Sequence, residues 1–468
     1  MPPTTPDQTT HDHSPIDTLV IGAGVSGLST AYHLTRAGQT VLVLEAADRL
    51  GGAIGTRNID GWQFETGPNT LMRTPALNAL LSELDLEIEA VAANEMAKKR
   101  FVVKNGHPVA LPGGPLELLT SPLFGLGDLF HLAREPWIKP ATTEETIAQF
   151  VRRRMGQGFL DWAIDPFVSG VYAGDPERLS VRAAIPKVYA LEQDYGSLIR
   201  GGLAKMKAGR LPRADGTPPD KKGLISFPGG MRILIDRLAD RIRESNQGRI
   251  QTTTSITALT QTPEGIWRAT AADGSQFEAK QVVLAIPAAA AAQLMAPLNS
   301  DLADLLSIIE YPPVNSVVLG FDRHQVAHPL NGFGMLIPGR EKRQTLGVLF
   351  SSTLFAHRAP AGKVLLTAFI GGRRRPEAAE GDDDTLIQRI LADLSPLLGI
   401  QGSPEFAHIQ RWPQAIPQYE LGYLDRLKSI DAANRTLPGL HLSGNWRTGI
   451  SVGDCLAGGA KLAQTMMS

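Results

Sequence analysis

The chain has 468 residues, of which 43% are hydrophobic and 20% are charged, a composition typical of a globular protein with two or three domains. Its formal net charge of -1 offers no general attraction for nucleic acid, so we expect no nucleic-acid partner. Cys455 is the single cysteine, which excludes an intrachain disulfide and a cysteine-based metal site, and we expect it to be a small buried apolar residue.

The first 15 residues are polar and lack both an apolar run and a basic flank. They match neither a secretory signal nor a transit peptide, and we expect a disordered tail. His11 and His13 in this tail are candidate metal ligands, but no metal site is predicted. No uncharged apolar run reaches the roughly 18–20 residues of a membrane span. The expected location is the cytoplasm, with peripheral contact to the inner face of the cell membrane as an open alternative.

The strongest pattern begins directly after the tail. An apolar run over 18–21 ends in Gly22-x-Gly24-x-x-Gly27, which opens a predicted helix, and a second apolar run, 41–44, ends in Glu45. In a βαβ dinucleotide unit such glycines permit a tight turn, close approach of the backbone to a pyrophosphate, and close packing of helix on strand. The helix N-terminus supplies unpaired N–H groups and a positive dipole end, and Glu45 is expected to hold the ribose hydroxyls.

The residues just beyond Glu45 decide between cofactors. Arg49-x-Gly51-Gly52 follows it, and a nicotinamide enzyme does not need a second glycine pair there, whereas in FAD proteins this stretch wraps the pyrophosphate. The sequence therefore predicts FAD as the cofactor. The residues predicted to contact it here are Gly22, Ala23, Gly24, Val25, Ser26, Gly27, Glu45, Arg49, Gly51 and Gly52.

The next elements lead into a helical region. Residues 60–70 predict a hairpin and a loop beside the glycine motif, 76–83 a short helix, and 99–112 a β-hairpin around Asn105-Gly106. From about 116 to 210 the pattern is helical, with Thr142-Thr-Glu-Glu as a capping signal before Ile147. Residues 209–223 are its loop-like end.

The chain then returns to sheet structure. A helix is predicted after Phe227-Pro-Gly-Gly, followed by strands at 250–259, 267–271, 276–279 and 282–286 and an alanine-rich helix after Pro287. Strands at 315–321, 333–337, 345–350 and 364–370 predict a second sheet. A last strand, glycine turn and helix from Leu440 onward are expected to close the flavin site from the opposite side.

These elements predict a mixed α/β and α+β fold. A discontinuous Rossmann-like FAD-binding domain is expected from residues 16–90, 223–300 and 411–468. A second, substrate-binding sheet domain is expected at 301–410. Residues 91–222 are expected to form a hairpin and a mainly helical insertion that contributes to the substrate pocket and is the candidate membrane-facing part.

Several blocks of sequence carry a family resemblance that extends from about residue 16 to the end of the chain. The chain resembles the oxygen-dependent, FAD-containing protoporphyrinogen oxidases, above all their bacterial and plastid branches, within the amine-oxidase-like flavoproteins. The block that begins at Asp165 is specific to this group. The blocks are Gly67-Pro-Asn-Thr, Asp165-Pro-Phe-Val-Ser-Gly-Val-Tyr-Ala-Gly-Asp-Pro, Ser226-Phe-Pro-Gly-Gly-Met, Phe350-Ser-Ser-Thr-Leu-Phe-Ala-His-Arg-Ala-Pro, Ile416-Pro-Gln-Tyr and Ser443-Gly-Asn-Trp.

The resemblance implies the oxidation of protoporphyrinogen IX, a tetrapyrrole, to protoporphyrin IX in heme and chlorophyll biosynthesis. Three two-electron rounds remove six electrons, and molecular oxygen reoxidises FAD to give hydrogen peroxide. The flavin carries this chemistry, so no catalytic side chain is predicted. The sequence agrees, because it offers no Ser/His/Asp arrangement, metal cluster or paired carboxylates at a credible spacing.

Four substrate-binding residues follow from the resemblance. Arg100 is expected to pair with a propionate, since a guanidinium fork suits a carboxylate. Phe355 is expected to stack on a pyrrole ring, Leu336 to form an apolar wall, and the backbone at Gly170 to approach the pyrrole nitrogens. Without the resemblance, Arg100 is also consistent with a solvated arginine at a strand start. Phe355 and Leu336 are then consistent with ordinary core, and Gly170 with a helix-terminating glycine.

The resemblance also extends the FAD site. It adds Ala46, Gly67, Pro68, Asn69, Thr70, Ile256, Trp412, Asn445, Ile450, Ser451 and Val452. Many related flavoproteins have Gly-Asp where this chain has Gly444-Asn445. The Arg373-Arg-Arg run is interpreted as a solvated turn that could bind propionates, and Asp382-Asp-Asp as an exposed loop.

Several alternatives stay open. A coproporphyrinogen III oxidase of the same fold needs a more basic pocket, to which Arg152, Arg153, Arg154 or Lys205 could contribute. A polyene desaturase or an amine oxidase uses the same scaffold, but Trp446 alone gives little support for the aromatic cage of an amine oxidase. A non-enzymatic FAD module is the remaining option. The apolar stretch Pro122-Leu-Phe-Gly-Leu-Gly-Asp-Leu-Phe fits a membrane contact, a homodimer contact or helical core equally well.

Overall fold

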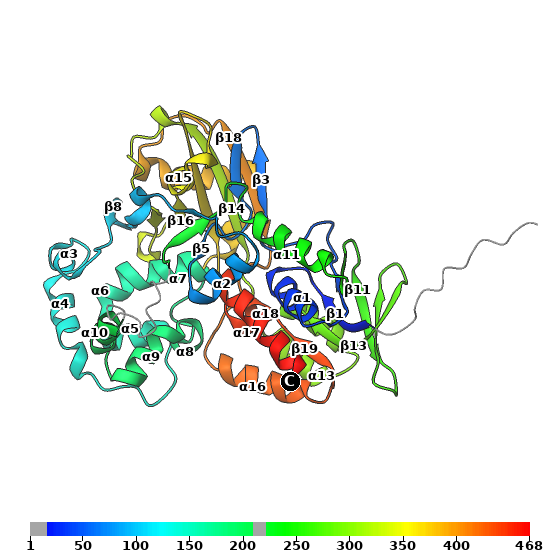
Figure 1. Cartoon of the computed structure of the whole chain (residues 1–468). Coiled ribbons are helices and arrows are strands. Elements are labelled where there is room, and N and C mark those ends of the chain that lie inside the picture. Colours follow the sequence, from blue (N-terminus) through cyan, green and yellow to red (C-terminus); the bar gives the residue numbers. More distant parts are fainter. Residues whose placement is uncertain (1–15, 209–220) are drawn as a thin grey trace, which may run out of the picture.

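The computed structural model describes residues 16–208 and 221–468. The predicted tail with His11 and His13, and most of the predicted loop 209–223, lie outside these residues. Two seven-stranded sheets, two smaller sheets and a helical region make up the described chain (Figure 1). The predicted α/β and α+β class is confirmed, whereas the proposed domain boundaries stay a prediction.

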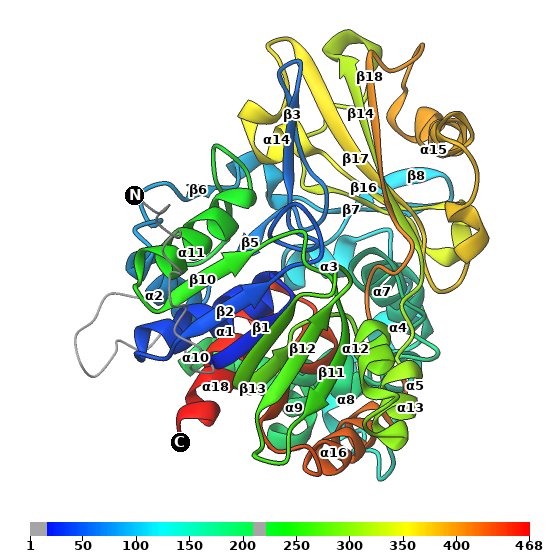
Figure 2. The same cartoon turned by 90° about the vertical axis from the view of Figure 1, so that its right-hand side faces the viewer.

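The first sheet is parallel on one side and antiparallel on the other (Figure 2). Its parallel part has the order β10-β2-β1-β13, β19 pairs with β13, and β12 and β11 extend β13 in antiparallel fashion. Strands β1 and β2 are almost wholly buried, as expected for parallel strands covered on both faces. The strands are β1 (Ile16–Ile21), β2 (Val41–Leu44), β10 (Gly248–Gln251), β11 (Ile256–Gln261), β12 (Trp267–Ala271), β13 (Gln276–Leu284) and β19 (Leu440–Leu442).

Strand β13 joins three remote parts of the chain. Leu284 is in register with Ile21 of β1 on one side and with Leu442 of β19 on the other. Helices α1 (Val25–Arg36) and α18 (Val452–Met467) pack closely, because Gly459 lies against Ser29 and the Ser29 hydroxyl donates to the Leu456 carbonyl at 2.8 Å. Helices α2 (Pro75–Glu83), α11 (Arg232–Glu244), α12 (Ala288–Met295), α13 (Ser300–Ser307), α16 (Tyr423–Asn434) and α17 (Asn445–Thr448) complete this part.

The second sheet has the order β18-β14-β17-β16-β15-β7-β8. Alternate residues of β14 face opposite sides. Val317 and Leu319 pack with helix α15 (Asp383–Leu398), whereas Val318 packs against Trp62 of the hairpin β3 (Thr56–Ile59) and β4 (Trp62–Glu65). The strands are β7 (Phe101–Lys104), β8 (His107–Ala110), β14 (Val314–Asp322), β15 (Gly334–Leu336), β16 (Thr345–Leu349), β17 (Lys363–Gly371) and β18 (Phe406–Trp412).

The hairpin β7–β8 turns at Asn105-Gly106, as predicted, and pairs with β15 of the second sheet. The second sheet is therefore itself discontinuous. A small three-stranded sheet has the order β5 (Leu71–Met72), β9 (Leu224–Ser226) and β6 (Val91–Ala92).

The insertion is helical, as predicted. It contains α3 (Pro115–Thr120), α4 (Leu126–Ala133), α5 (Ile147–Arg154), α6 (Gln157–Phe159), a π-helical turn η3 (Leu160–Ile164), α7 (Asp165–Tyr172), α8 (Val181–Ala184), α9 (Pro186–Tyr195) and α10 (Leu198–Ala208). Across the two described ranges, no helix combines the length and the apolar character needed to cross a bilayer.

Four local predictions were wrong. The expected strand 250–259 is two strands, β10 and β11, whereas the expected strands 276–279 and 282–286 are the single strand β13. Helix α5 is capped by Thr146, whose hydroxyl accepts from Gln149 N at 3.1 Å, and not by residues 142–145. Asp382 is exposed as expected but caps α15, because its carboxylate accepts from Thr385 N at 2.8 Å, so it begins a helix.

Candidate active site

The glycine turn after β1 is sterically specified at two positions and open at the third. Gly22 has a φ of +102° and a Cβ there would lie 2.6 Å from the Ala285 carbonyl oxygen, while a Cβ at Gly27 would overlap the Gly22 carbonyl. A Cβ at Gly24 would meet nothing within 4 Å. Gly24 is the N-cap of α1, and neither a capping side chain nor an acidic residue covers the first turn. The turn therefore fits an anionic pyrophosphate.

The acid and the second glycine pair lie against this turn. The Glu45 carboxylate accepts from Ala23 N at 2.8 Å and from Ala47 N at 2.9 Å, which fixes it at the end of β2 beside Ala46. Gly51 N donates to the Ala23 carbonyl at 2.9 Å, and Gly51 forms an isolated bridge with Gly24. Arg49 donates to the Gly52 carbonyl at 2.8 Å. The structure thus brings together the residues that the N-terminal motif names.

Helix α18 adds a second N-terminus next to the first. Ser451, which follows Ile450, caps α18, since its hydroxyl accepts from Asp454 N at 3.1 Å. Val452, the first residue of α18, is buried. One turn on, Cys455 is buried as predicted, and burial raises the pKa of its thiol to about 11. Residues 450–452 therefore lead into the helix that packs along α1.

A loop and a tryptophan complete the predicted FAD site. Trp412, at the end of β18, donates from its indole to the Thr66 carbonyl at 2.8 Å. A Cβ at Gly67 would overlap the Ala53 carbonyl, so the loop Gly67-Pro68-Asn69-Thr70 lies directly on the segment that follows Gly52. Ile256 begins β11, two residues after Thr254, whose N–H donates to the Glu45 carbonyl at 2.8 Å.

Asn445 begins the short helix α17, just after Gly444, which has a φ of +138°. Its carbonyl accepts a hydrogen bond from the Tyr419 hydroxyl. The next residue, Trp446, is fully buried and donates to the carbonyl of Ile286, two residues beyond β13, at 3.2 Å. A buried Trp446 adds no support for an aromatic cage.

Two of the predicted substrate residues touch. A Cβ at Gly170 would overlap Leu336 Cδ2, which places α7 directly on β15. The alternative of a helix-terminating glycine was wrong, because α7 continues past Gly170 to Tyr172 and is capped by Ala173, whose φ is +47°. Leu336 also pairs with Val102 of β7, two residues after Arg100.

Phe333 lies between Arg100 and the small core cluster that contains Phe355. The exposed Arg100 guanidinium lies 5.3 Å from the centre of the Phe333 ring, and no acidic side chain among the described residues pairs with it. Phe333 packs against a small core cluster that contains Phe355, which is only 4% exposed. Sequence reasoning missed Phe333, because a lone aromatic before a short strand carries no functional signal.

A buried ion pair links this cluster to the segment that precedes the loop 67–70. Arg358 lies 5.4 Å from the Phe355 ring centre and pairs with Glu65 at 2.6 Å, and their side chains are 2% and 0% exposed. Glu65 also accepts from Thr56 and from Met231 N, and the next residue, Thr66, is the one that Trp412 contacts. Burial raises the pKa of Glu65 and lowers that of Arg358, while each charge offsets part of the other's shift. No sequence pattern predicts this pair.

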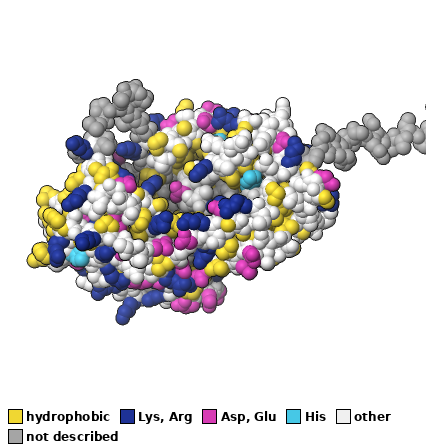
Figure 3. Space-filling view, turned by 90° about the horizontal axis from the view of Figure 1, so that it is seen from below, with side chains coloured by type: hydrophobic (Ala, Val, Ile, Leu, Met, Phe, Trp, Pro, Cys, Tyr) yellow, Lys and Arg dark blue, Asp and Glu magenta, His cyan; other side chains and the backbone are white. Residues whose placement is uncertain are grey.

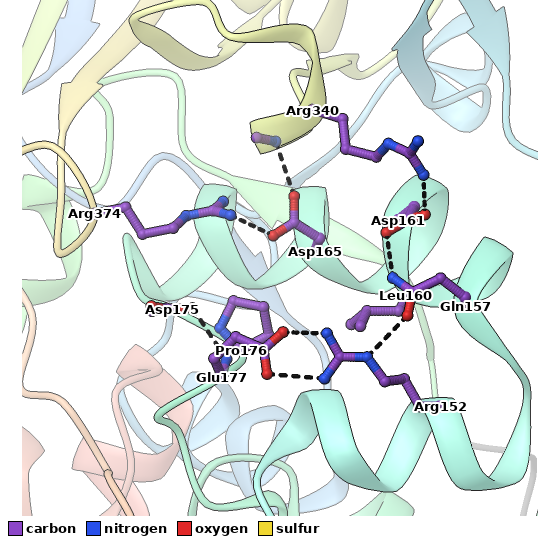
Figure 4. A pocket seen from close by; sticks show the side chains of 11 residues that line it. Arg152, Gln157, Leu160, Asp161, Asp165, Asp175, Pro176, Glu177, Arg340 and Arg374 are labelled. Carbon is purple, nitrogen blue, oxygen red and sulfur yellow. Dashed lines mark hydrogen bonds and ion pairs between the residues drawn. The ribbon is translucent and has the colours of Figure 1, made fainter.

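A polar cavity of about 270 Å³ lies between the insertion and the second sheet (Figure 4). Three arginines line it, and each is paired with an acid: Arg152 with Glu177, Arg340 with Asp161, and Arg374 with Asp165. The solvated-turn interpretation of the Arg373-Arg-Arg run was therefore incomplete, because Arg373 also pairs with Glu310 at 2.7 Å.

Two further arginines of α5 are neutralised inside the insertion. Arg153 pairs with Glu145 and with Glu192 at 2.8 Å. Arg154, which is fully buried, pairs with Glu135 at 2.9 Å and with Glu192. Together with the Arg152–Glu177 pair, this leaves none of these three arginines as an unpaired cation for a substrate carboxylate.

Comparison with known proteins agrees with this geometry. A model of the family described as flavin containing amine oxidoreductase matches residues 25–467. The chain belongs to this family. Protoporphyrinogen oxidase 2 of Arabidopsis thaliana is 33% identical over 474 residues, which cover 96% of this chain and 93% of that protein. Such similarity places the chain in the protoporphyrinogen oxidase branch of the amine oxidoreductases, and it confirms the resemblance described above.

Two other relatives extend the comparison. Coproporphyrinogen III oxidase of Bacillus subtilis is 27% identical over 460 residues, which cover 94% of this chain and 95% of that enzyme. A crystal structure from Exiguobacterium sp. 255-15 superposes with a TM-score of 0.82 at 25% identity and covers 97% of this chain and 99% of that one. As an amine oxidoreductase family member, the chain is an oxidoreductase with FAD as its cofactor.

Proposed function

We propose that the chain oxidises protoporphyrinogen IX to protoporphyrin IX, with molecular oxygen as the final acceptor and hydrogen peroxide as the second product, in heme or chlorophyll biosynthesis. The observation that carries the proposal is a continuous series of side-chain contacts, which connects the predicted FAD site with the predicted substrate-binding residues. It runs from the loop after Glu65, through Arg358 and Phe355, to Phe333 and Arg100.

The proposed FAD-holding groups come from three segments. The N–H groups at the start of α1 would hold the pyrophosphate, Glu45 the ribose, and residues 67–70, 256, 445 and 450–452 the rest of the cofactor. When bound, FAD accepts the two electrons and the hydrogen that leave the substrate in each round. The polypeptide orients the macrocycle and excludes side reactions.

On the substrate side, Leu336 and Phe355 supply apolar surface, and Arg100 supplies a cation at its edge. The pairing of Arg152, Arg153 and Arg154 with glutamates argues against a pocket for four propionates. This favours the two-propionate substrate. The 27% identical coproporphyrinogen III oxidase makes coproporphyrinogen III the second candidate.

Anaerobic stopped-flow measurement of flavin reduction tests the substrate directly. Protoporphyrinogen and coproporphyrinogen are mixed in parallel with the FAD-loaded protein, and we expect faster reduction by protoporphyrinogen. Faster reduction by coproporphyrinogen would reverse the choice of substrate. Reoxidation of the reduced protein with air, with peroxide assayed, tests the acceptor.

Arg100→Ala is expected to weaken substrate binding by about 1.5–3 kcal/mol, the usual contribution of a charged hydrogen bond. The Michaelis constant for protoporphyrinogen measures the effect. Arg100→Lys keeps the charge but loses the bidentate fork, so it should recover part of the affinity. An unchanged Michaelis constant in Arg100→Ala would show that Arg100 does not touch the substrate.

We also propose that the insertion rests on an anionic lipid surface. Figure 3 shows hydrophobic side chains at the end of the molecule where α3 and α4 lie. Arg134, on the same surface, lies 5.9 Å from the Phe130 ring centre and adds a cation beside it. Apolar side chains flanked by cations suit a bilayer interface. The exposed apolar residues, named here the insertion patch, are Leu116, Leu119, Leu126, Phe130 and Trp137.

The double variant Leu126→Ser/Phe130→Ser should bind phosphatidylglycerol vesicles about 10-fold or more weakly, because each fully buried Leu or Phe contributes about 1.5–3 kcal/mol. Co-sedimentation measures binding. Ile88→Ser is the control, since Ile88 is 98% exposed but lies outside the insertion patch. Equal binding by both variants would contradict the membrane proposal, and loss of a dimer in the double variant would assign the patch to subunit contact.

A further inference from the structure

Residues 416–423, which include the end of the β18–α16 connection and the first residue of α16, contact two regions that are far apart in the sequence. It carries Tyr419, and Tyr423 follows as the first residue of α16. Both tyrosines are buried, with 5% and 2% of their surface exposed, and their ring centres lie 4.6 Å apart. Sequence reasoning included Ile416-Pro-Gln-Tyr only as a family block and gave the tyrosines no role.

The backbone of this segment binds the insertion. Ser180 N donates to the Tyr419 carbonyl at 2.8 Å, and Glu420 forms an antiparallel bridge with Leu179. Gln418 donates from its side chain to the Tyr172 carbonyl, at the end of α7, at 3.0 Å. Helix α7 is the element on which Gly170 meets Leu336.

The side chains of the two tyrosines point the other way, toward the flavin side. The Tyr419 hydroxyl donates to the carbonyl of Asn445, and the Tyr423 hydroxyl donates to the carbonyl of Trp446. These two residues form the first turn of α17. Burial raises the pKa of both hydroxyls far above the normal value, so they stay protonated and remain donors.

We propose that Tyr419 and Tyr423 are positioning residues, which hold the Asn445–Trp446 turn in place for FAD and couple it to the helical insertion. This inference rests on the proposed contact between Asn445 and the cofactor. A phenylalanine at either position keeps the ring packing but leaves a buried carbonyl without its donor, so the turn is free to shift.

The first test compares Tyr419→Phe, Tyr423→Phe and Tyr172→Phe. Tyr172 is a matched control, because it is 7% exposed and its hydroxyl donates to a carbonyl inside the insertion, that of Ala184. Apoprotein is titrated with FAD, and flavin fluorescence gives the dissociation constant. We expect about 3- to 10-fold weaker binding in Tyr419→Phe and in Tyr423→Phe, as one lost hydrogen bond implies, and no change in Tyr172→Phe.

The thermal midpoint of each apoprotein separates positioning from general instability. All three variants are expected to lose similar stability, so only a positioning role raises the FAD dissociation constant selectively. Equal FAD affinity in all three variants and the unsubstituted protein would overturn the inference. Failure of the unsubstituted protein to bind FAD would instead overturn the proposed function, so the two failures are distinguishable.

Hydrogen exchange tests the coupling. In the unsubstituted protein, adding FAD should slow exchange of the amide of Ser180, which bonds to the Tyr419 carbonyl. In Tyr419→Phe at saturating FAD, this slowing should be smaller. Exchange at Ser180 that does not respond to FAD in the unsubstituted protein would show that the insertion and the flavin site are not coupled through this segment.

Discussion

Replacing Arg358 with methionine should lower the free energy of unfolding by about 3–5 kcal/mol, because the change leaves the buried Glu65 carboxylate without its cation. The pair is almost completely inaccessible, with 2% and 0% of the two side chains exposed. Urea unfolding, followed by tryptophan fluorescence, measures the loss. Arg268→Met is the matched control, since its ion pair with Glu278 is 42% and 40% exposed and should contribute less than about 1 kcal/mol.

The pH dependence of the Arg358→Met deficit identifies its cause. Burial already raises the pKa of Glu65 above 4.5, and the charge of Arg358 is the largest influence that lowers it. Without Arg358 the folded-state pKa rises further, so the folded state binds a proton more readily than the unfolded state. The deficit should therefore be largest near neutral pH and shrink as the pH falls toward 4.5. A deficit of the same size at every pH would point to lost packing instead.

The double variant Glu65→Gln/Arg358→Met completes the cycle. It removes both charges, so no unpaired ion remains in the core, and it should be more stable than Arg358→Met alone. If the double variant loses the sum of the two single losses, the two side chains do not interact energetically.

Gly27→Ala should lower the stability of the apoprotein, whereas Gly24→Ala should lower its affinity for FAD. A Cβ at Gly27 overlaps the Gly22 carbonyl, so helix α1 cannot keep its position on β1 and the apoprotein should lose about 3 kcal/mol or more. A Cβ at Gly24 meets no protein atom within 4 Å, and the φ of -68° suits alanine, so the apoprotein should unfold normally. It should nevertheless bind FAD about 1–3 kcal/mol more weakly, because the methyl group occupies space beside the uncapped helix turn.

Apoprotein thermal unfolding and FAD titration, measured on the same samples, distinguish the two outcomes. Gly202→Ala in α10 is the control, because a Cβ there also meets nothing within 4 Å and lies in the insertion. Unchanged FAD affinity in Gly24→Ala would place the pyrophosphate away from this turn and would remove the main support for the proposed cofactor site.

The parts of the fold that the sequence predicts correctly depend on local patterns. Gly27 is required by a contact with the Gly22 carbonyl within one βαβ unit, and Asn105-Gly106 turns a hairpin by its own backbone preference. The split of 250–259 into β10 and β11 is different. It depends on pairing with β2 on one side and with β12 on the other, and no local pattern contains that information.

The candidate site divides in the same way. The residues of the N-terminal motif are close in sequence and adopt the adjacent positions that the motif predicts. The Glu65–Arg358 pair and the Tyr419–Asn445 contact join separate segments, and their residue types occur often on ordinary surfaces, so only the tertiary structure identifies them. The Arg373-Arg-Arg run shows the converse. Its sequence alone predicts a solvated turn, whereas the tertiary structure pairs Arg373 and Arg374 with acidic side chains.

The central position of β13 has a consequence for biosynthesis of the protein. Its neighbours β1 and β19 are separated by more than four hundred residues of sequence, and α18 follows β19. A nascent chain on the ribosome exposes β1 and the glycine turn long before β19 and α18 have been translated. The proposed FAD site requires residues 440–467 to leave the exit tunnel, so we expect the coenzyme to be loaded only after they have been translated.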